Sequence, residues 1–298
     1  MKFDVIVGNP PYQDQMRSGN ALWSLFVKKA FDELVNKNGF VAMITPARWV
    51  LPGCNIKEGK IRIWDSYIKK LNTKIINLGE CSKYFKEGSG TNYFSYFVTQ
   101  KNSQHKPVTI ITNTEKFNIN LTKASWLPLR NCNSKSLQII QKIMSVKTET
   151  FELAWKYDRS QKNLVNIKTK KFMVPVFIGN DSIRFSDHQS PEHLTPKVLF
   201  KLGRFIEYQK RIMIDSSGDM SYNSAYIVPI KKNDNVNYLK SKLYCFLAQC
   251  LNSGSEITAE GYRTLPKLDA TRSWTDIDLY KHFNLTEEEI AYVEANFK

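Results

Sequence analysis

The sequence contains no apolar run long enough to cross a membrane, which would require about 20 consecutive apolar residues. Its longest apolar stretch, Phe40 to Leu51, is interrupted by Thr45, Pro46 and Arg48. No apolar signal-peptide segment comes before Asn9 either. These absences argue against a membrane span and a secretory leader, and they predict a soluble, cytoplasmic protein.

Cysteine and histidine are too scattered for a disulfide framework or a structural zinc site. The five cysteines form no C-x-x-C pair, and the four histidines show no ligand spacing. We therefore expect a reduced setting, thiols packed as small apolar side chains, and no metal site. The residues concerned are Cys54, Cys81, Cys132, Cys245, Cys250, His105, His188, His193 and His282.

Acidic residues are outnumbered, with 28 Asp and Glu against 43 Lys and Arg and a formal net charge of +15. Such an excess favours a polyanionic partner, because each neutralised phosphate of a nucleic acid releases condensed counterions. A basic, well-solvated surface is the alternative, since net charge concerns association and not chemistry. Charge alone therefore favours nucleic acid without excluding that alternative.

The first part of the chain alternates strand and helix patterns, which is typical of an α/β sheet with mostly parallel strands. Phe3 to Val7 is an apolar run without polar alternation and predicts a strand buried on both faces. Apolar residues then recur at helical spacing from Asn20 to Asn36. Later elements are predicted at Phe40 to Thr45 (strand), Ile61 to Leu71 (helix), Ile75 to Leu78 (strand) and Tyr93 to Val98 (strand).

The pattern changes after a polar stretch that ends at Pro107. Short strand-like pieces such as VTIIT, MVPVFI and SAYIVPI then alternate with isolated helices and basic loops. We therefore expect a domain of residues 1–112 followed by an α+β domain of residues 113–298. Two capping-box spacings predict short helices near the end, at Thr275 with Asp278 and at Thr286 with Glu289.

The strand at Phe3 to Val7 leads into NPPY, residues Asn9 to Tyr12, a rigid turn rich in hydrogen-bond acceptors. Its two prolines fix φ and lack a backbone donor, so the carbonyls of the turn can face a ligand. In open α/β sheets, ligands bind just beyond the carboxyl ends of the strands, where this turn is expected. An ordinary Pro-Pro turn with Asn9 as a local cap is the other interpretation.

This NPPY turn resembles the catalytic motif of amino-group DNA methyltransferases. The segments GNALWSLFVKKAFDEL and NGFVAMITPARWV are similar to those of class-gamma adenine-N6 methyltransferases, especially the methylase portion of type IIG restriction-modification enzymes. LGECSKYFKEGSGTNYFSYFV resembles a later motif of that family, and LPKLDATRSWTDIDLYKHFNLTEEEIAYVEANF resembles the tail of its target-recognition domains. The resemblance implies a partial Rossmann-like methyltransferase sheet in residues 1–112 and a target-recognition domain in residues 113–298.

The resemblance also implies a chemistry, methyl transfer from S-adenosylmethionine to the amino group of an adenine rotated out of double-stranded DNA. The side-chain oxygen of Asn9 and the backbone carbonyl of Pro10 would accept the two amine hydrogens and concentrate negative charge on the nitrogen. Pro11 would keep the turn rigid, and Tyr12 would stack on the flipped base. Phe85 is the candidate for the second stacking face, with Tyr84 behind it.

In that family the cofactor site is formed mainly by a strand and a Gly-rich loop before the catalytic turn, and by an acidic residue after the next strand. These features do not occur in the sequence, which begins shortly before the turn. A sheet without those strands would expose the apolar edge at Phe3 to Val7. We therefore expect a separate or fused cofactor-binding half as a partner, in a bacterial or phage-encoded protein. The part of the cofactor pocket expected here is formed by Asn9, Asn20, Leu22 and Phe26.

Basic residues interleave with aromatic ones in the second predicted domain, a pattern that suits contacts with DNA phosphates. A charged rim around a small core would give the same pattern, and the sequence leaves both interpretations open. The candidate DNA-binding residues are Lys168, Lys170, Lys171, Arg204, Lys210 and Arg211, which lie among the aromatic residues Phe172, Phe205 and Tyr208.

Other motifs favour structural interpretations. The GSGT segment that begins at Gly88 lacks the G-x-G-x-x-G spacing of a phosphate loop, and it predicts a loop beside the target base. The EGK segment that begins at Glu58 lacks the preceding Pro-Asp of a nuclease site, and Cys245 and Cys250 fit a core helix. Two alternative functions stay open, a catalytically inactive sequence-specific DNA-binding protein and a truncated remnant.

Overall fold

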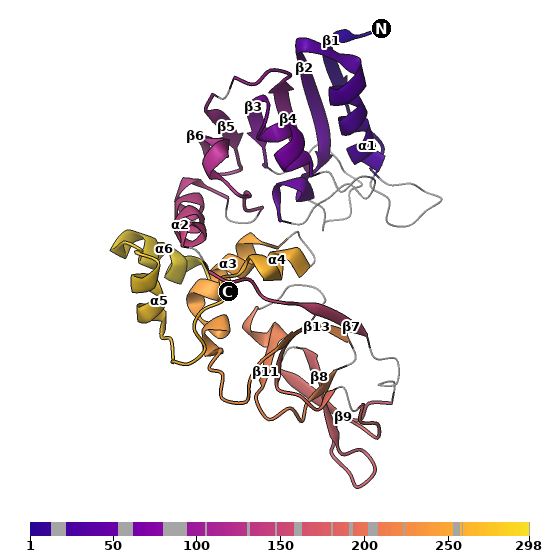
Figure 1. Ribbon diagram of the computed structural model, residues 1–298, viewed down its shortest axis with the longest axis vertical. Helices are drawn as coiled ribbons and strands as arrows, with labels where there is room; N and C mark the ends of the chain where they lie inside the picture. Colours follow the sequence, from indigo (N-terminus) through magenta and orange to yellow (C-terminus); the bar gives the residue numbers. More distant parts are fainter. Residues whose placement is uncertain are drawn as a thin grey trace. The chain divides into compact units, whose positions relative to one another are not determined.

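The computed structural model of the protein describes residues 1–12, 22–52, 62–79, 94–104, 106–129, 132–146, 148–157, 163–179, 181–190, 193–201, 208–222, 224–252, 257 and 259–297. The chain forms two compact units, Met1–Gln141 and Lys142–Lys298 (Figure 1). Within these ranges, no helix is both long and apolar enough to cross a membrane.

The first unit is built on a six-stranded sheet with the strand order β1-β2-β4-β3-β5-β6 (Figure 1). A helix, α1, and the π-helical turn that follows it connect β1 to β2. The predicted strands are present with shifted ends, whereas the helical pattern before β3 contains a single π-helical turn among the described residues. The bounds are β1 (Phe3–Gly8), α1 (Leu22–Lys29), first π-helical turn (Ala30–Leu34), β2 (Val35–Pro46), 3-10 turn (Ala47–Val50), second π-helical turn (Trp64–Ile68), β3 (Asn72–Asn77), β4 (Phe94–Gln100), β5 (Val108–Ile111), β6 (Lys116–Ile119), 3-10 turn (Leu121–Lys123) and α2 (Ser134–Ser145).

This sheet is mixed, so the prediction of mostly parallel strands is wrong, although the α/β class is confirmed. Among the described strands, β1 pairs in parallel with β2 and β3 with β5. β4 runs antiparallel between β2 and β3, and β6 runs antiparallel to β5. An apolar run such as β4 indicates that a strand is buried, but it does not encode the direction in which the strand enters the sheet.

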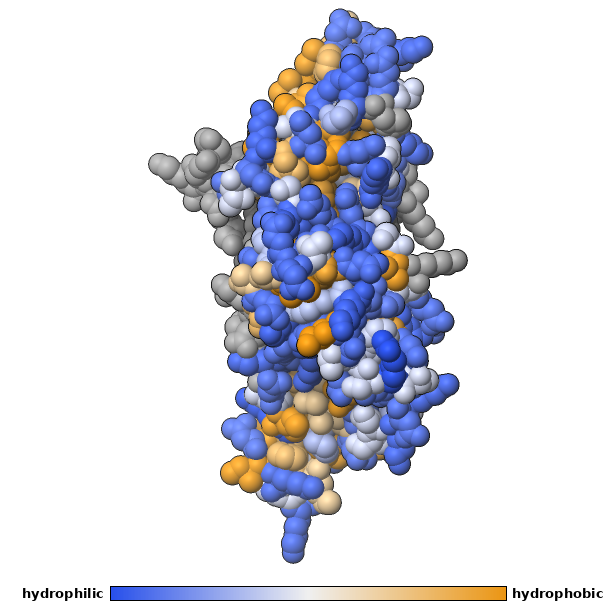
Figure 2. All heavy atoms as spheres, turned by 90° about the vertical axis from the view of Figure 1, so that its left-hand side faces the viewer, coloured by the Kyte–Doolittle hydropathy of each residue, from blue (hydrophilic) through white to orange (hydrophobic). Residues whose placement is uncertain are grey.

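One face of the sheet carries the core of the first unit. Val41, Ile76 and Phe97 lie on this face of neighbouring strands, and each is 0% exposed. Phe31 of the first π-helical turn stacks on Phe97 with the ring centroids 6.3 Å apart. On β2, residues such as Ala42 that alternate with this set stay partly exposed, which places them on the opposite face. Apolar atoms accordingly reach the surface of this unit, in the upper part of Figure 2.

β1 is the outermost described strand, and the prediction that both of its faces are buried is wrong. Phe3, Val5 and Val7 alternate with polar or half-buried positions and are 45%, 58% and 77% exposed. Only β2 pairs with β1 among the described strands. An apolar run predicts burial only where other segments cover it, and Val5 and Val7 lie on the same face as Phe40 and Ala42 of β2, which the described residues leave partly exposed.

The second unit combines two small sheets with helices. Its sheets have the strand orders β11-β10-β13-β7 and β12-β8-β9. The sequence places most helices after the strands, as the α+β prediction expected. The bounds are β7 (Ala154–Tyr157), β8 (Val174–Gly179), β9 (Ser182–Ser186), β10 (Lys197–Lys201), 3-10 turn (Gln209–Arg211), β11 (Ile212–Asp215), β12 (Ser221–Tyr222), β13 (Ser224–Pro229), 3-10 turn (Asn237–Lys240), α3 (Lys242–Cys250), α4 (Ala259–Thr264), α5 (Asp276–His282) and α6 (Glu287–Asn296).

The local predictions for the end of the chain are confirmed. Thr275 caps α5 and Thr286 caps α6, each in a capping box with the carboxylate three residues later. Cys245 and Cys250 lie in α3 with 0% exposure, as expected of core thiols. Burial is the main cause that raises the pKa of the Cys245 thiol to about 12, so this thiol stays protonated at neutral pH.

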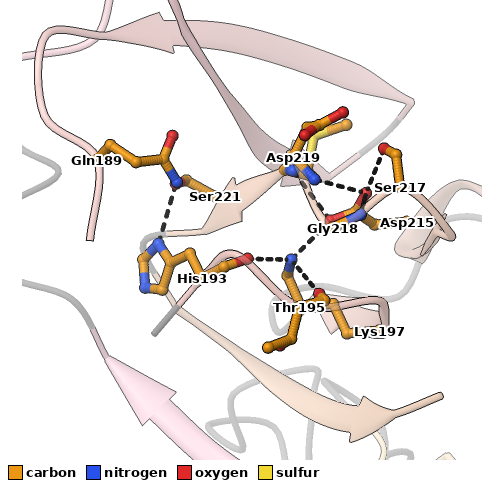
Figure 3. A network of polar contacts seen from close by, with 10 residues as sticks. Gln189, His193, Thr195, Lys197, Asp215, Ser217, Gly218, Asp219 and Ser221 are labelled. Atoms are coloured by element: carbon orange, nitrogen blue, oxygen red, sulfur yellow. Dashed lines mark hydrogen bonds and ion pairs between the residues drawn. The ribbon is translucent and has the colours of Figure 1, made fainter. Parts of the chain in front are cut away.

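A buried ion pair joins strands of the second unit (Figure 3). The Nζ atom of Lys197 donates to Asp215 Oδ2 at 2.6 Å and to the backbone carbonyls of His193 at 2.7 Å and Thr195 at 3.0 Å. The Asp215 carboxylate also accepts the backbone amides of Gly218 and Met220, each at 2.9 Å. Both charges are therefore fully hydrogen-bonded, which offsets the cost of removing them from water.

A buried histidine extends this polar network toward the other sheet. The Nδ1 atom of His193 lies 3.0 Å from Ser221 Oγ of β12, and Gln189 Nε2 donates to the same hydroxyl at 3.3 Å (Figure 3). The His193 ring packs on Tyr222 with centroids 3.9 Å apart. Because Lys197 and Asp215 belong to β10 and β11, the network connects the two sheets.

The boundary between the compact units differs from the predicted domain boundary. β5 and β6 belong to the first sheet, and the first unit continues to Gln141. The division into residues 1–112 and 113–298 concerns functional domains. The compact units do not test it, so it stays a prediction. In the sequence, the strand-like segment VTIIT follows the change of pattern at Pro107. In the structure this segment lies in the first unit.

Candidate functional site

The NPPY turn lies where β1 ends, at the carboxyl end of a parallel pair of strands. Gly8 is the last residue of β1 and pairs with Met43 of β2, three residues before β2 ends. Pro10 is buried, whereas Asn9 and Pro11 are exposed and Tyr12 is half-buried. The buried proline anchors the turn, and the exposed amide of Asn9 can reach a ligand beyond the edge of the sheet.

The side chains of Asn9 and Tyr12 contact each other within the turn. The Tyr12 hydroxyl donates a hydrogen bond to Oδ1 of Asn9. An amide oxygen has two lone pairs, so this bond leaves acceptor capacity on Asn9. In this form, the Tyr12 hydroxyl uses one of the two acceptor positions of Asn9 Oδ1.

An aromatic residue that the sequence did not single out supports the turn. Phe94 is the first residue of β4 and pairs with Pro46 at the end of β2. Its ring lies 5.0 Å from the Tyr12 ring, centroid to centroid, at 40°. The signal for Phe94 in the sequence is weak, because Phe94 is one of several aromatic residues in this segment. Only the strand order shows that it lies beside Tyr12. Phe94 therefore backs Tyr12 and limits where its ring can move.

Further predicted site residues lie on α1 or outside the described residues. Leu22 opens α1 and is half-buried, and Phe26 lies one turn later with 47% of its surface exposed. Because α1 leads back from the carboxyl end of β1 to the start of the parallel strand β2, its first turn lies toward the NPPY end of the sheet. Asn20 and Phe85 lie outside the described residues.

The predicted DNA-binding residues fall into two places in the second unit. Lys168, Lys170 and Lys171 are exposed in one loop, and the Nζ atom of Lys171 lies 5.4 Å from the Phe172 ring centroid. Arg204 lies outside the described residues. The structure therefore presents the three lysines to solvent together.

The other predicted basic residues lie in the 3-10 turn before β11. Lys210 is half-buried there, and Arg211 is only 9% exposed, so its side chain does not reach the surface as a phosphate contact requires. Burial and then the charge of Arg211 lower the pKa of Lys201 to about 8. Arg211 thus acts on a neighbouring lysine inside the unit.

The described residues show no cluster of three or more histidine, cysteine, aspartate or glutamate side chains that could hold a metal ion. The turn itself offers amide and carbonyl oxygens and an aromatic ring. Such a site can accept hydrogens from an amine and stack on a planar group. It holds no side chain with the basicity of a strong general base.

Comparisons with known proteins agree with this geometry. Residues 1–81 match the family model described as Eco57I restriction-modification methylase. An uncharacterized adenine-specific methylase of Mycoplasma pneumoniae (strain ATCC 29342 / M129 / Subtype 1) is 39% identical over 113 residues, which cover 36% of this chain and 25% of that protein.

Two solved structures align with most of this chain, and only the first of them has a TM-score above 0.5. The type IIL restriction-modification enzyme MmeI in complex with DNA aligns with a TM-score of 0.51 and 11% identity, over 98% of this chain and 54% of that chain. The type IIG restriction endonuclease BpuSI aligns with a TM-score of 0.35 and 12% identity, over 99% of this chain and 49% of that chain.

These relatives are longer than the region they share with this protein. The chain spans 25% of the curated methylase and 54% of MmeI. At 11% identity, the likeness to MmeI concerns the fold alone. The matched residues 1–81 include the whole NPPY turn, and they confirm the resemblance expected from it: this part of the chain is similar to the Eco57I family of restriction-modification methylases.

Proposed function

We propose that the protein takes part in site-specific methylation of DNA at adenine N6, as part of a restriction-modification system. We further propose that it is bacterial or phage-encoded and cytoplasmic. One observation carries the proposal: the NPPY turn projects from the carboxyl end of β1, inside the segment that matches the Eco57I family. There, Asn9 is exposed and Pro10 is buried, so one acceptor faces outward from an anchored turn.

The turn supports a direct nucleophilic attack by the adenine amine. Asn9 Oδ1 and the Pro10 carbonyl accept the two N6 hydrogens, which concentrates negative charge on the nitrogen and makes its lone pair available. Tyr12 stacks on the flipped base while Phe94 supports its ring from behind. S-adenosylmethionine would supply the methyl group when bound: the amine nitrogen would form the N–C bond as the S–C bond breaks, and the nitrogen would then release one proton to water.

The described residues fit only one side of a cofactor. Phe26 offers an exposed aromatic face on α1, and Asn9 offers an amide, at the same end of the sheet. The carboxylate of Asp4 is already bound, because the side-chain amide of Asn36 donates to it at 2.8 Å. The cofactor therefore needs a further segment, in the same or a separate polypeptide, that supplies the remaining contacts.

The open edge of β1 gives that further segment a place to bind. The unpaired side of β1 can accept another strand, and a layer that covers the outer face of the extended sheet would bury Val5 and Val7. Burying an apolar side chain of this size contributes about 1.5–3 kcal/mol when exposure is complete, so partial exposure still leaves several kcal/mol for association. We assign this edge to the cofactor-binding half.

The second unit is the proposed target-recognition part, which approaches double-stranded DNA. Its exposed Lys168, Lys170 and Lys171 and the net charge of +15 over the whole chain favour contact with phosphates. Base readout would come from side chains of residues 113–298 that reach a groove. Lys210 and Arg204 complete the proposed set, and Arg211 is left out of it because its side chain is buried.

The experiment that tests this function compares Asn9→Ala with the wild type in the cell that encodes the protein, where any partner is present. N6-methyladenine is mapped across the genome by single-molecule sequencing. We expect one methylated sequence motif to disappear in Asn9→Ala and to persist in Asn233→Ala, a matched change at an exposed turn of the second unit. An unchanged methylation pattern in Asn9→Ala contradicts the assignment and favours a catalytically inactive DNA-binding protein.

The need for a further segment has its own test in vitro. The purified chain is mixed with tritiated S-adenosylmethionine and genomic DNA from a strain that lacks the gene. We expect no transfer of label to adenine by the chain alone. Transfer by the chain alone, abolished by Asn9→Ala, would show that these residues form a complete enzyme.

A further inference from the structure

Three apolar side chains stand in solvent around the β8–β9 hairpin of the second unit. Ile167 is 76% exposed, Met173 is 56% exposed and Ile183 is 38% exposed. Ile167 and Met173 belong to the loop of residues 163–173, which leads into β8, and Ile183 lies on β9. All three belong to segments that the Val165–Phe185 bridge and the β8–β9 pairing connect, and exposed apolar side chains that share a region mark contact surfaces more often than single ones do.

The loop of residues 163–173 is held in place by backbone contacts. Val165 and Phe185 of β9 exchange two hydrogen bonds, at 3.0 Å and 2.8 Å. Further along, the Thr169 amide donates to the Phe172 carbonyl at 3.0 Å, and Thr169 Oγ1 accepts the Phe172 amide at 3.1 Å. Ile167 lies between these two fixed points, so its side chain projects from an ordered loop.

The isolated bridge between Val165 and Phe185 places the loop beside β9, the strand that carries Ile183. Ile167 follows Val165 by two residues and Ile183 precedes Phe185 by two, so the two exposed isoleucines flank the same bridge in sequence. The lower part of Figure 2, where the second unit lies, shows apolar atoms reaching the surface beside hydrophilic ones.

The charges around Ile167 are positive. Lys168, Lys170 and Lys171 follow it directly, all exposed, and Arg184 is exposed on β9. Residues 163–173 contain no acidic residue. Asp181 and Asp187 lie at the two ends of β9 and leave the loop itself basic. A partner that fits this loop therefore carries negative charge on its surface. It also has an apolar layer that the Ile167 side chain can contact.

We propose that Ile167 is a wedge that inserts between stacked base pairs from the minor groove while Lys168, Lys170 and Lys171 contact the flanking phosphates. The inference rests on the proposed function, because it assumes that the second unit binds DNA. Apolar wedges of this kind partly unstack a base step and kink the duplex by about 20–90°. Base pairs supply the apolar layer, and their phosphates supply the negative charge.

The kink has a use in the proposed reaction. Unstacking a step lowers the cost of rotating a nearby base out of the helix, because part of the stacking is already lost. Flexible pyrimidine–purine steps such as TA deform most easily, so the wedge gives sequence preference at positions that no side chain reads by hydrogen bonds. Ile167 is thus a specificity-determining residue that acts through the shape of the DNA.

The chain contains a matched control for the wedge. Ile277 in α5 is 64% exposed, nearly as much as Ile167, but it lies between Asp276 and Asp278. Its acidic neighbours repel phosphates. Changing Ile277 to serine removes a similar exposed apolar surface from a place where DNA is not expected. This control therefore distinguishes the effect of losing the wedge from the effect of losing apolar surface in general.

The test uses the full chain and a duplex of about 30 base pairs that carries TA steps and a fluorophore at each end, since such steps deform readily. Energy transfer reports the bend, and fluorescence anisotropy reports affinity. We expect wild type and Ile277→Ser to bend the duplex alike. Ile167→Ser should reduce the bend by more than half and weaken binding about 5- to 20-fold, in line with an unstacking contact.

Salt dependence tests the lysines separately. Replacing Lys168, Lys170 and Lys171 with glutamine should lower the slope of log affinity against log salt by about 2–3, since each phosphate contact contributes about 0.9. Ile167→Ser should leave that slope unchanged, because it removes no charge. The two variants therefore distinguish the wedge from the phosphate contacts.

The outcomes separate this inference from the proposed function. Binding and bending that are equal in Ile167→Ser and wild type overturn the wedge but leave DNA binding by the unit intact. No DNA binding by the wild type overturns the wedge together with the DNA-binding role of the unit. Loss of binding to vesicles of anionic phospholipid in Ile167→Ser, with DNA bending unchanged, assigns the loop to a membrane surface and likewise overturns the wedge.

Discussion

The two units differ in one pair of features: the first has an exposed apolar strand, and the second has a buried ion pair. The first leaves Val7, an apolar side chain of a sheet strand, 77% exposed at the edge of β1. The second buries two full charges, Lys197 and Asp215, and satisfies both by hydrogen bonds from its own residues. The comparison indicates that the buried charges of the second unit are satisfied within it, whereas β1 of the first unit has an apolar face that another segment can cover.

The largest expected effect comes from breaking the buried ion pair of the second unit. Asp215→Ala leaves the Lys197 ammonium buried without its counter-charge and frees the amides of Gly218 and Met220. We expect a loss of about 3–5 kcal/mol in the free energy of unfolding, measured by urea denaturation. The double change Lys197→Met with Asp215→Leu should cost clearly less, because no charge remains buried. Equal losses in the two variants would show that the pair does not act as described.

A second prediction sharpens the contrast between core and edge in the first unit. Val41 on β2 is 0% exposed, whereas Val7 on its neighbour β1 is mostly exposed. Val41→Ala should lower the free energy of unfolding by about 2 kcal/mol, and Val7→Ala by less than about 0.5 kcal/mol. Thermal unfolding of the isolated chain measures both. A similar loss for the two variants would mean that β1 is already covered in the free chain.

A third prediction concerns the end of the second unit. Thr286 caps α6, and its side chain accepts the Glu289 amide while the Glu289 carboxylate accepts the Thr286 amide. Thr286→Ala should cost about 1 kcal/mol, as capping residues do. Thr286→Ser keeps the hydroxyl and should cost little. Urea denaturation of the two variants gives the difference, and an equal cost would argue against the cap as its source.

The fourth prediction is a dependence of stability on pH. Burial, and then Arg211, lower the pKa of Lys201 to about 8 from its ordinary value of 10.5. Between these pH values the unfolded chain binds more protons at this residue than the folded chain, so its contribution makes stability rise with pH. Lys201→Met should remove that slope from the unfolding free energy measured between about pH 8 and 10.5. A slope that is identical in wild type and variant would show that Lys201 titrates normally.

Local features of both units could be read from the sequence because they depend on neighbouring residues. The NPPY turn after an apolar strand and the capping boxes at Thr275 and Thr286 each involve residues within a few positions, and all are present. The family resemblance rested on the same kind of local pattern, and residues 1–81 confirm it.

Contacts between residues far apart in the sequence could not be predicted from it. The insertion of β4 between β2 and β3, which brings Phe94 to Tyr12, depends on strand order that periodicity does not contain. The Lys197–Asp215 pair was missed for the same reason, since neither residue stands out among many charges until β10 and β11 pair. Burial of Arg211 likewise depends on packing and not on its basic neighbours.

The measurement that tests the central claim most directly places a charge on the open edge of β1 in the cell that encodes the protein. In Val7→Lys, the free chain should melt as the wild type does, because this side chain is exposed, but a segment that covers this face of β1 would have to bury the lysine charge. We expect N6-methyladenine at the recognition sequence to fall to background in Val7→Lys and to stay at the wild-type level in the control Ile277→Lys. Full methylation in Val7→Lys would contradict the claim that another segment completes this sheet in the working enzyme.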